Sequence, residues 1–350
     1  MEPITVLRRI AFLMERAGEP GYRGRAFRRA AEALLALSED ELRSRSENGS
    51  LGELAGIGPV SEGIVAEVLT GEIPAYLARF EERVREAEAT PSGQLYAALR
   101  GDCHVHSNWS DGDAEIREMA DAAIEMGHEY IVLTDHSPTL TIARGLSADR
   151  LHEQLEVVAA LNEELAPFRI LAGIEVDILA DGALDQEDDL LARLDVVVGS
   201  LHSLLRMERE SMTQRMLHAI ANPHLDILGH CTGRMKTRRR DRPESEFDAA
   251  LVFEECARLD KAVEINSLEA RRDPPRRLIE QALVAGCRFS IDSDAHSPGA
   301  LVGKVRGCER AAVAGVTPDR VVNTLPAEAL VEWAQGHEPR PGDRVGSSAT

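Results

Sequence analysis

Two histidines one residue apart, followed by a carboxylate, form the first group of residues in this sequence that could bind a metal. His104 and His106 end a short apolar segment, and Asp111 lies on the stretch that follows. In a β-strand, residues i and i+2 point to the same side, so both imidazoles can reach one ion. Imidazole and carboxylate ligands suit a first-row divalent metal such as zinc, manganese or iron. Paired histidines also occur on ordinary strands, so this pair alone is weak evidence.

The same kinds of side chain recur at the ends of further apolar segments. Between Gly101 and about Trp333, seven strand candidates alternate with helical segments, a pattern typical of parallel βα units. In a β/α barrel the C-terminal ends of the strands face one side, where active sites are built. Chance is a poor explanation for so many such residues, and we expect a multinuclear metal site. Its candidate ligands are His104, His106, Asp111, His136, Glu175, His202, His230, Asp294 and His296.

Residues 1–90 are predicted to form an all-helical domain. Ile4–Leu13 has helical periodicity, Gly21–Arg25 predicts a turn, and Ala26–Leu37 predicts a second helix. Further on, a Gly-Ile-Gly hairpin (Gly56–Gly58) precedes the helical segment Val60–Leu69, which predicts a helix-hairpin-helix. The glycines permit a tight backbone and leave amides free to meet a phosphate at the N-terminus of the second helix.

The role of this hairpin stays open between nucleic-acid contact and simple packing of the module. DNA-binding hairpins usually carry lysines just after the turn, whereas Pro59–Glu62 contains none. The net charge of −20 also makes the whole chain a poor general nucleic-acid binder, because affinity for phosphate backbones comes largely from cationic contacts. Any such binding must therefore be local.

Length and composition predict one large domain and one small one. The 350 residues are 43% hydrophobic, and no apolar run is long enough to cross a bilayer. Five cysteines without framework spacing, and an N-terminus without a signal-peptide pattern, favour a cytoplasmic protein with no membrane partner. We expect a helical domain at 1–90, a linker or first covering helix at 91–100, the α/β domain at 101–336, and a disordered tail at 337–350.

The strand-end motifs together resemble the polymerase and histidinol phosphatase (PHP) domain, in the version found at the C-terminus of bacterial family X DNA polymerases. The resemblance spans about residues 100 to 325, and the N-terminal module resembles the small helical domain that opens those polymerases. It is specific because every ligand motif is present. These motifs are His104-Val-His106, Thr134-Asp-His-Ser137, Gly173-Ile-Glu-Val-Asp177, Ser200-Leu-His-Ser203, Gly229-His-Cys-Thr-Gly-Arg234, Glu264-Ile-Asn266 and Asp294-Ala-His296.

The resemblance implies a distorted seven-stranded β/α barrel with three divalent metal ions, which would be zinc, manganese or iron. It assigns the first ion to His104, His106, Glu175 and Asp294. Glu175 would bridge to a second ion held by His202 and His230, and Asp111, His136 and His296 would hold the third. The expected activity is hydrolysis of phosphate esters, in which the ions activate water and clamp the phosphoryl oxygens.

Two departures from those polymerases matter. The small module runs almost directly into the PHP-like part, which leaves no room for a polymerase palm, so we predict no polymerase activity. No lysine precedes Lys236, which excludes a lyase that works through a lysine Schiff base in the small module. Arg234 and Arg144 are candidate phosphate clamps because arginine suits bidentate phosphate contact. Asp135 is expected to orient a metal ligand without contacting the metal itself.

Three functional hypotheses follow from the sequence. The first is a metal-dependent phosphoesterase on nucleic-acid ends or nucleotides, acting as a 3′–5′ exonuclease or end-processing phosphatase, with DNA ends bound through the N-terminal module. The second is a small-molecule phosphatase of the histidinol phosphatase type. The third is a non-catalytic module whose metals only stabilise the barrel, which the complete ligand set disfavours.

Overall fold

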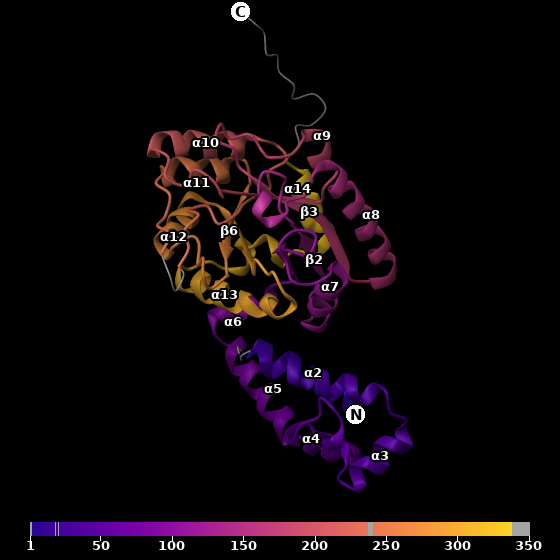
Figure 1. The fold of residues 1–350 in the computed structure, drawn as a ribbon. Coiled ribbons are helices and arrows are strands. Elements are labelled where there is room, and N and C mark those ends of the chain that lie inside the picture. The colour runs from indigo at the N-terminus through magenta and orange to yellow at the C-terminus, as the bar shows by residue number, and fades with distance from the viewer. Residues whose placement is uncertain (1, 18, 20, 237–240, 338–350) are drawn as a thin grey trace, which may run out of the picture. The chain divides into compact units, whose positions relative to one another are not determined.

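The structure is a computed structural model that describes residues 2–17, 19, 21–236 and 241–337. It divides into two compact units (Figure 1): residues 1–94 with 125–127, and residues 95–124 with those from 128 onward. Apart from His337, the tail predicted to be disordered lies outside the described residues. No helix within the described ranges is long and apolar enough to span a membrane.

The first unit is built from helices around a small apolar core. Leu7, Ile10 and Met14 are fully buried at the spacing that places side chains on one face of a helix. Gly21–Arg25, predicted to be a turn, is helical, and this prediction was wrong. Gly24 is buried there, and tertiary packing outweighs the low helix propensity of glycine. The elements are α1 (Pro3–Arg16), α2 (Gly21–Leu35), α3 (Glu39–Glu47), the 3-10 turn η1 (Leu51–Glu53), α4 (Pro59–Leu69) and α5 (Ala75–Glu88), followed by α6 (Pro91–Ala98), which continues into the second unit.

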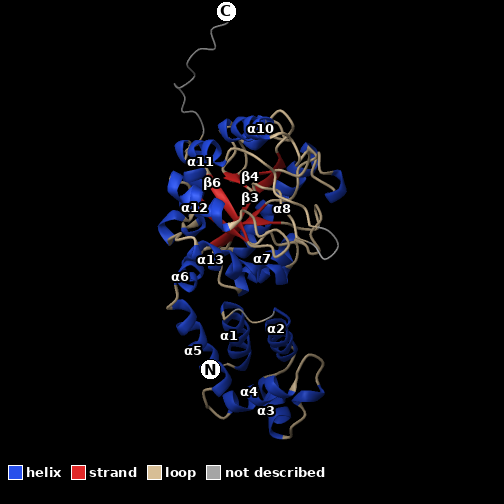
Figure 2. Cartoon of the chain, turned by 90° about the vertical axis from the view of Figure 1, so that its left-hand side faces the viewer, coloured by secondary structure: helices blue, strands red, loops and turns tan. Residues whose placement is uncertain are grey.

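The second unit is a sheet of seven parallel strands, in the order β1-β2-β3-β4-β5-β6-β7, surrounded by helices (Figure 2). This confirms the predicted β/α barrel with a small all-α N-terminal part. Strands covered on both faces are expected to be apolar throughout, and most positions of these strands are buried. The strands are β1 (Gly101–Val105), β2 (Tyr130–Leu133), β3 (Arg169–Asp177), β4 (Val196–Ser200), β5 (Ile227–Leu228), β6 (Ala262–Asn266) and β7 (Arg288–Asp292).

Helices and short 3-10 turns connect the strands and cover the barrel. Apolar side chains from both strands and helices form its main core, among them Ile174, Val197, Phe253 and Phe289. The covering elements are α7 (Ile116–Glu125), η2 (Thr141–Ala143), α8 (Ala148–Leu165), α9 (Asp188–Leu191), α10 (Arg209–Ala221), α11 (Ala249–Arg258), α12 (Arg276–Ala285), η3 (Pro298–Gly303), α13 (Lys304–Val313), η4 (Pro318–Arg320), η5 (Val322–Thr324) and α14 (Ala327–Gln335).

Candidate metal centre

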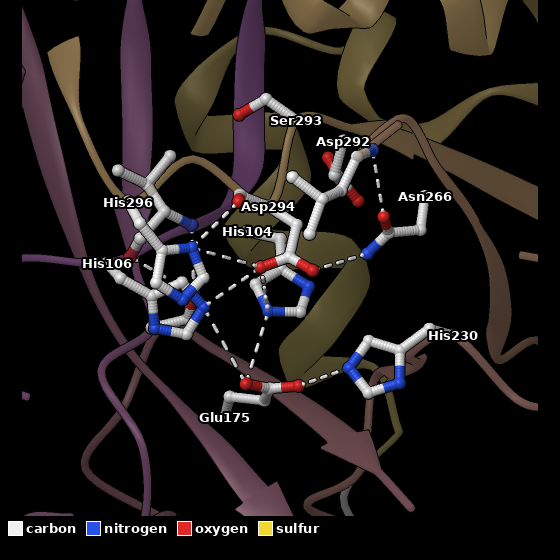
Figure 3. Close-up of polar contacts among 12 residues, drawn as sticks. His104, His106, Glu175, His230, Asn266, Asp292, Ser293, Asp294 and His296 are labelled. Carbon is white, nitrogen blue, oxygen red and sulfur yellow. Dashed lines mark hydrogen bonds and ion pairs between the residues drawn. The ribbon is translucent and has the colours of Figure 1, made fainter. Parts of the chain in front are cut away.

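All nine predicted ligands lie at the C-terminal ends of the barrel strands. Because parallel strands end on the same side, residues from 104 to 296 meet there although they are far apart in the chain. They fall into four overlapping clusters, and within each cluster the ligand atoms lie within 4.8 Å of one another. The three groups described next follow the three ions of the predicted assignment. Figure 3 shows Glu175 between the imidazoles of His104 and His106 on one side and His230 on the other.

The first group joins β1, β3 and the segment that follows β7. Glu175 Oε2 lies 3.4 Å from His104 Nε2 and 3.7 Å from His106 Nε2. Asp294 Oδ1 lies 3.4 Å from His106 Nε2 and 3.9 Å from His104 Nε2. Two imidazoles and two carboxylates therefore surround one small space.

The second group uses the other oxygen of the same glutamate. Glu175 Oε1 lies 2.7 Å from His230 Nε2 and 3.3 Å from His202 Nε2. Glu175 Oε2 also lies 2.8 Å from His136 Nδ1. The glutamate therefore contacts imidazoles of all three groups, which is the position of a bridging ligand.

The third group is the one most open to solvent. Asp111 Oδ1 lies 3.3 Å from His296 Nε2 and 3.5 Å from His136 Nε2. The side chains of Asp111 and His296 are 37% and 31% exposed, whereas the other predicted ligands are at most 7% exposed. This group is therefore the part of the centre that solvent reaches most easily.

Several donor atoms of the centre are buried without a hydrogen-bond partner in the described part of the chain. They include His104 Nε2, Glu175 Oε2 and both ring nitrogens of His106 and of His202. Buried polar atoms are nearly always paired, and each one left unpaired costs about 1–3 kcal/mol. Divalent ions bound by imidazole nitrogen and carboxylate oxygen would satisfy these atoms, so the residues present fit such ions.

The charges in the centre keep its carboxylates ionised but act differently on its imidazoles. Burial would lower the pKa of His104 and His202, but the neighbouring carboxylates, Glu175 foremost, raise the pKa of His104 well above its usual value and that of His202 to about 9. Burial raises the pKa of Glu175, but the positive charges of His104 and His202 outweigh it and hold the pKa well below its usual value. The same balance, with His104 as the main cation, holds the pKa of Asp294 well below its usual value. Burial lowers the pKa of His106 to about 3, which keeps this imidazole neutral. Ionised carboxylates and neutral imidazoles are the forms that bind metal, so a bound ion would take the place of the protons on His104 and His202.

Comparison with known proteins assigns both parts of the chain. Residues 102–267 match the PHP domain, and residues 1–72 match a helix-hairpin-helix domain. A probable phosphatase of Photobacterium profundum is 30% identical over 206 residues, which are 56% of this chain and 77% of that protein. The chain belongs to the PHP family. The predicted resemblance is thereby confirmed.

Two further relatives of this PHP chain have more specific descriptions. The DNA polymerase/3′-5′ exonuclease PolX of Bacillus subtilis is 42% identical over 199 residues, which are 57% of this chain but only 34% of that protein. A solved histidinol phosphate phosphatase of Lactococcus lactis, complexed with zinc, L-histidinol and phosphate, matches 62% of this chain and 94% of its own, with 17% identity and a TM-score of 0.44. The family, the curated relatives and the buried ligand groups identify the chain as a PHP-type metal-dependent phosphoesterase.

Three further residues, which were not predicted as site residues, contact the candidate ligands and support their orientation. Glu264 Oε1 lies 2.7 Å from His104 Nδ1. Asn266 Nδ2 and Arg271 Nε both donate to Asp294 Oδ2, at 2.9 and 3.0 Å. Such partners fix the orientation of a ligand and leave its other atom free for the metal.

The sequence carries a signal for two of these three residues. Glu264 and Asn266 end β6 at i and i+2, much as His104 and His106 lie at and just after the end of β1. They belong to a strand-end motif that the sequence analysis named without giving these residues a role. Arg271 lies in the loop after β6, beside a second arginine, and nothing in its spacing distinguishes it.

The two predicted phosphate clamps lie in different surroundings. Arg234 donates from Nε to Arg271 O at 3.0 Å and from Nη2 to Arg272 O, and its Nη1 lies 3.4 Å from Glu244 Oε1. It therefore supports the loop that carries Arg271. Arg144 is exposed, with a left-handed backbone at φ 57°. The clamp role of both arginines stays a prediction.

Asp135 acts on the centre through a loop. Its carboxylate accepts hydrogen bonds from Ser107 N at 2.8 Å and Ser107 Oγ at 2.6 Å, and from Gln154 Nε2 at 2.7 Å. It also accepts one from Ser110 N at 3.3 Å. The carboxylate thus fixes the loop that carries Asp111, whereas the sequence predicted that it orients a ligand.

The hairpin of the first unit uses its own side chains to satisfy its amides. Gly58 N donates to Ser61 Oγ at 3.0 Å, and Gly52 N donates to Glu62 Oε1 at 3.1 Å. Ile57 N donates to Leu54 O at 3.1 Å. The amides of Gly52, Ile57 and Gly58 are therefore already bonded, and of these only Gly58 lies at the N-terminus of α4.

Proposed function

We propose that the nine strand-end residues bind three divalent ions. His104, His106, Glu175 and Asp294 hold the first, Glu175 with His202 and His230 the second, and Asp111, His136 and His296 the third. The observation that carries this assignment is the position of Glu175. Its Oε1 faces His202 and His230, and its Oε2 faces His104, His106 and His136. When bound, ions of this kind lower the pKa of water and neutralise charge on a phosphoryl group during in-line displacement. Zinc, manganese and iron all suit the donor set.

Within this proposal, Arg271 contacts the substrate phosphate. Its Nε is committed to Asp294, while its Nη1 is buried and has no hydrogen-bond partner among the described residues. Arg271 contacts the proposed ligand Asp294 directly. Its unpartnered Nη1 is therefore placed to donate to a phosphoryl oxygen near the ions. Arginine is well suited to this contact because its donors match phosphate geometry.

We propose that the substrate is the end of a nucleic acid or a nucleotide, hydrolysed by 3′–5′ exonuclease or end-processing phosphatase action. The match of the N-terminal residues to a helix-hairpin-helix domain supports this proposal, as does the sequence identity of part of the chain with part of PolX. The helix-hairpin-helix match ends at residue 72 and the PHP match begins at residue 102. A nucleotidyltransferase core does not fit between them, so we propose no polymerase activity.

The alternative is a small-molecule phosphate monoesterase of the histidinol phosphatase type. The internally satisfied amides of the hairpin favour it, because they weaken the case for a phosphate backbone at this motif. The description of curated relatives as probable phosphatases is also compatible with it. The five cysteines are free and buried, which supports a reducing, cytoplasmic setting for either activity.

A substrate panel tests the proposal. The full chain, loaded with manganese or zinc, is assayed on 3′-labelled single- and double-stranded DNA, on histidinol phosphate and on a chromogenic phosphate monoester. We expect shortening of DNA or removal of its terminal phosphate, and loss of all activity with a chelator. His104→Ala and Asp294→Ala should lose activity together with bound metal. Parent-like hydrolysis by either variant would contradict the metal assignment, and activity on histidinol phosphate alone would favour the alternative.

A further inference from the structure

The contact between β1 and β7, where the barrel closes, is built differently from the contacts between the other strands. β3 and β4 pair through five consecutive residues, from Gly173 with Val196 onward. Among the described residues, β1 meets the β7 end through one isolated bridge, Val105 with Ala295, beside which His106 N donates to Ala295 O at 2.9 Å. We call residues 101–106 and 291–296 the seam. Backbone pairing contributes little to it.

Two crossed carboxylates replace the missing backbone ladder. Asp292 Oδ1 accepts from Cys103 N at 2.8 Å, and Asp102 Oδ1 accepts from Ser293 N at 3.1 Å. Both carboxylates are completely buried, and the Oδ2 atom of each has no hydrogen-bond partner in the described structure. Each carboxyl group therefore links the two edges through one oxygen atom.

Lys304 supports the β1 edge of the seam, and Asn323 links this edge to β7. Lys304 is completely buried, and its Nζ donates to Gly101 O at 2.8 Å and lies 3.6 Å from Asp102 Oδ2. Asn323 donates to Ile291 O at 2.8 Å and accepts from Ile291 N at 3.1 Å. Asn323 Nδ2 also lies 3.3 Å from Gly101 O, so this side chain contacts both edges, and the ammonium of Lys304 lies beside Asp102.

The proposed ligands of the first and third ions lie directly beyond these contacts, on both edges of the seam. His104 and His106 belong to the β1 edge, and Asp294 and His296 follow β7. Figure 3 shows Asp294 directed toward His104 and His106 across this gap, with Asp292 and Ser293 behind it. An ion held by His104, His106 and Asp294 would join the two edges where backbone pairing does not.

We infer that closure of the barrel at the seam depends on metal coordination, and that Lys304 is a positioning residue that holds the β1 ligands opposite Asp294. The inference rests on the proposed metal centre. It has a physical basis in the general rule that the regions with the fewest backbone hydrogen bonds open first. It adds a conformational consequence of metal binding that the catalytic assignment does not require.

Hydrogen exchange of the full chain tests the inference without any substitution. Protein loaded with manganese or zinc is compared with chelator-treated protein after its metal content has been measured. We expect amides of the seam to exchange about tenfold faster without metal, and amides of β3 and β4 to change by less than about twofold. Equal acceleration in both regions, or no acceleration at the seam, overturns the inference.

A matched pair of lysine substitutions tests the role of Lys304. Lys304→Met should weaken metal binding by about 10- to 100-fold, as removal of an outer support of a metal site does. Lys261→Met is the control, because Lys261 is also buried and donates to a carbonyl, Pro223 O at 3.1 Å, outside the seam. Its metal affinity should stay within about twofold of the parent value. Equal shifts in the two variants overturn the positioning role. If Lys304→Met fails to fold, hydrogen exchange of the parent chain still decides the inference.

Metal content separates this inference from the proposed function. A chain that binds no metal under any loading condition contradicts both. A chain that binds metal and hydrolyses phosphate esters, but whose seam exchanges equally with and without metal, contradicts only the coupling between metal and seam.

Discussion

The metal centre and the hairpin of the first unit differ in whether their polar groups have hydrogen-bond partners. In the metal centre, ring nitrogens of His106 and His202 and an oxygen of Glu175 are buried without hydrogen-bond partners among the described residues. In the hairpin, Ser61 and Glu62 already satisfy the amides of Gly58 and Gly52. The first arrangement leaves buried atoms that a ligand would satisfy, whereas in the second these two amides are already satisfied.

A region can therefore match a family of phosphate-binding motifs without having free groups that would bind a phosphate. Both regions match known families, and both motifs belong to classes that meet phosphate groups. The cost of unpaired buried atoms makes ion binding strongly favourable at the barrel. At the hairpin, a phosphate must displace a carboxylate or approach beside it. The evidence for phosphate chemistry is therefore much stronger at the barrel than at the hairpin.

The largest effect is expected from a change that removes the bridge of the metal centre. Glu175→Gln should lower kcat/KM by about 10³-fold, because several kcal/mol of transition-state stabilisation depend on the ions it holds. Metal bound per chain should fall in the same variant. Glu163→Gln, on the exposed face of α8, serves as the control and should behave as the parent. If Glu175→Gln kept the metal content and the activity of the parent, the contrast between the metal centre and the hairpin would be wrong.

A smaller effect separates the two arginines near the centre. Arg271→Met should lower kcat/KM by about 10- to 100-fold, because it removes a partner of Asp294 together with the buried Nη1 donor. Arg234→Met removes bonds to the carbonyls of Arg271 and Arg272, so it should cost only about fivefold through loosening of the loop. Steady-state kinetics on a phosphate monoester measures both. A larger loss in Arg234→Met would restore Arg234 as the clamp that the sequence predicted.

The fold and the membership of the candidate site could be predicted because they depend on regular periodicity. Residues at i and i+2 of a strand share a face, and parallel strands end on one side, so His104, Glu175 and His230 could be placed together without coordinates. The structure brings all nine candidates together. Their role as ligands stays a proposal.

Other features could not be predicted because they depend on side chains reaching across loops. The contact of Arg271 with Asp294 needs the shape of the loop after β6, and the contact of Glu62 with Gly52 needs the hairpin already folded. The helix at Gly21–Arg25 depends on a buried glycine whose local propensity favours a turn. In each case tertiary packing decides, and no spacing in the sequence records it.

The smallest effect is expected at the hairpin, where a single charge can be removed. Glu62 lies in the first turn of α4, and its carboxylate occupies the place where a phosphate would meet the amide of Gly52. Glu62→Gln keeps an acceptor for that amide but removes the negative charge. If the hairpin contacts DNA, affinity for an end-labelled single strand should rise by about two- to fivefold at low salt, because a charge at a helix N-terminus contributes about 0.3–1 kcal/mol. Fluorescence anisotropy at low and high salt measures this rise.

The control for that variant is Glu72→Gln, which removes the same charge from an exposed position after α4. A gain confined to Glu62→Gln places DNA at the hairpin, and the gain should shrink with added salt because exposed charges are screened. An equal gain in both variants reports only the lower net charge of the chain. No gain in Glu62→Gln means that the hairpin is a packing element. The substrate would then have to be recognised at the barrel alone, as the small-molecule alternative requires.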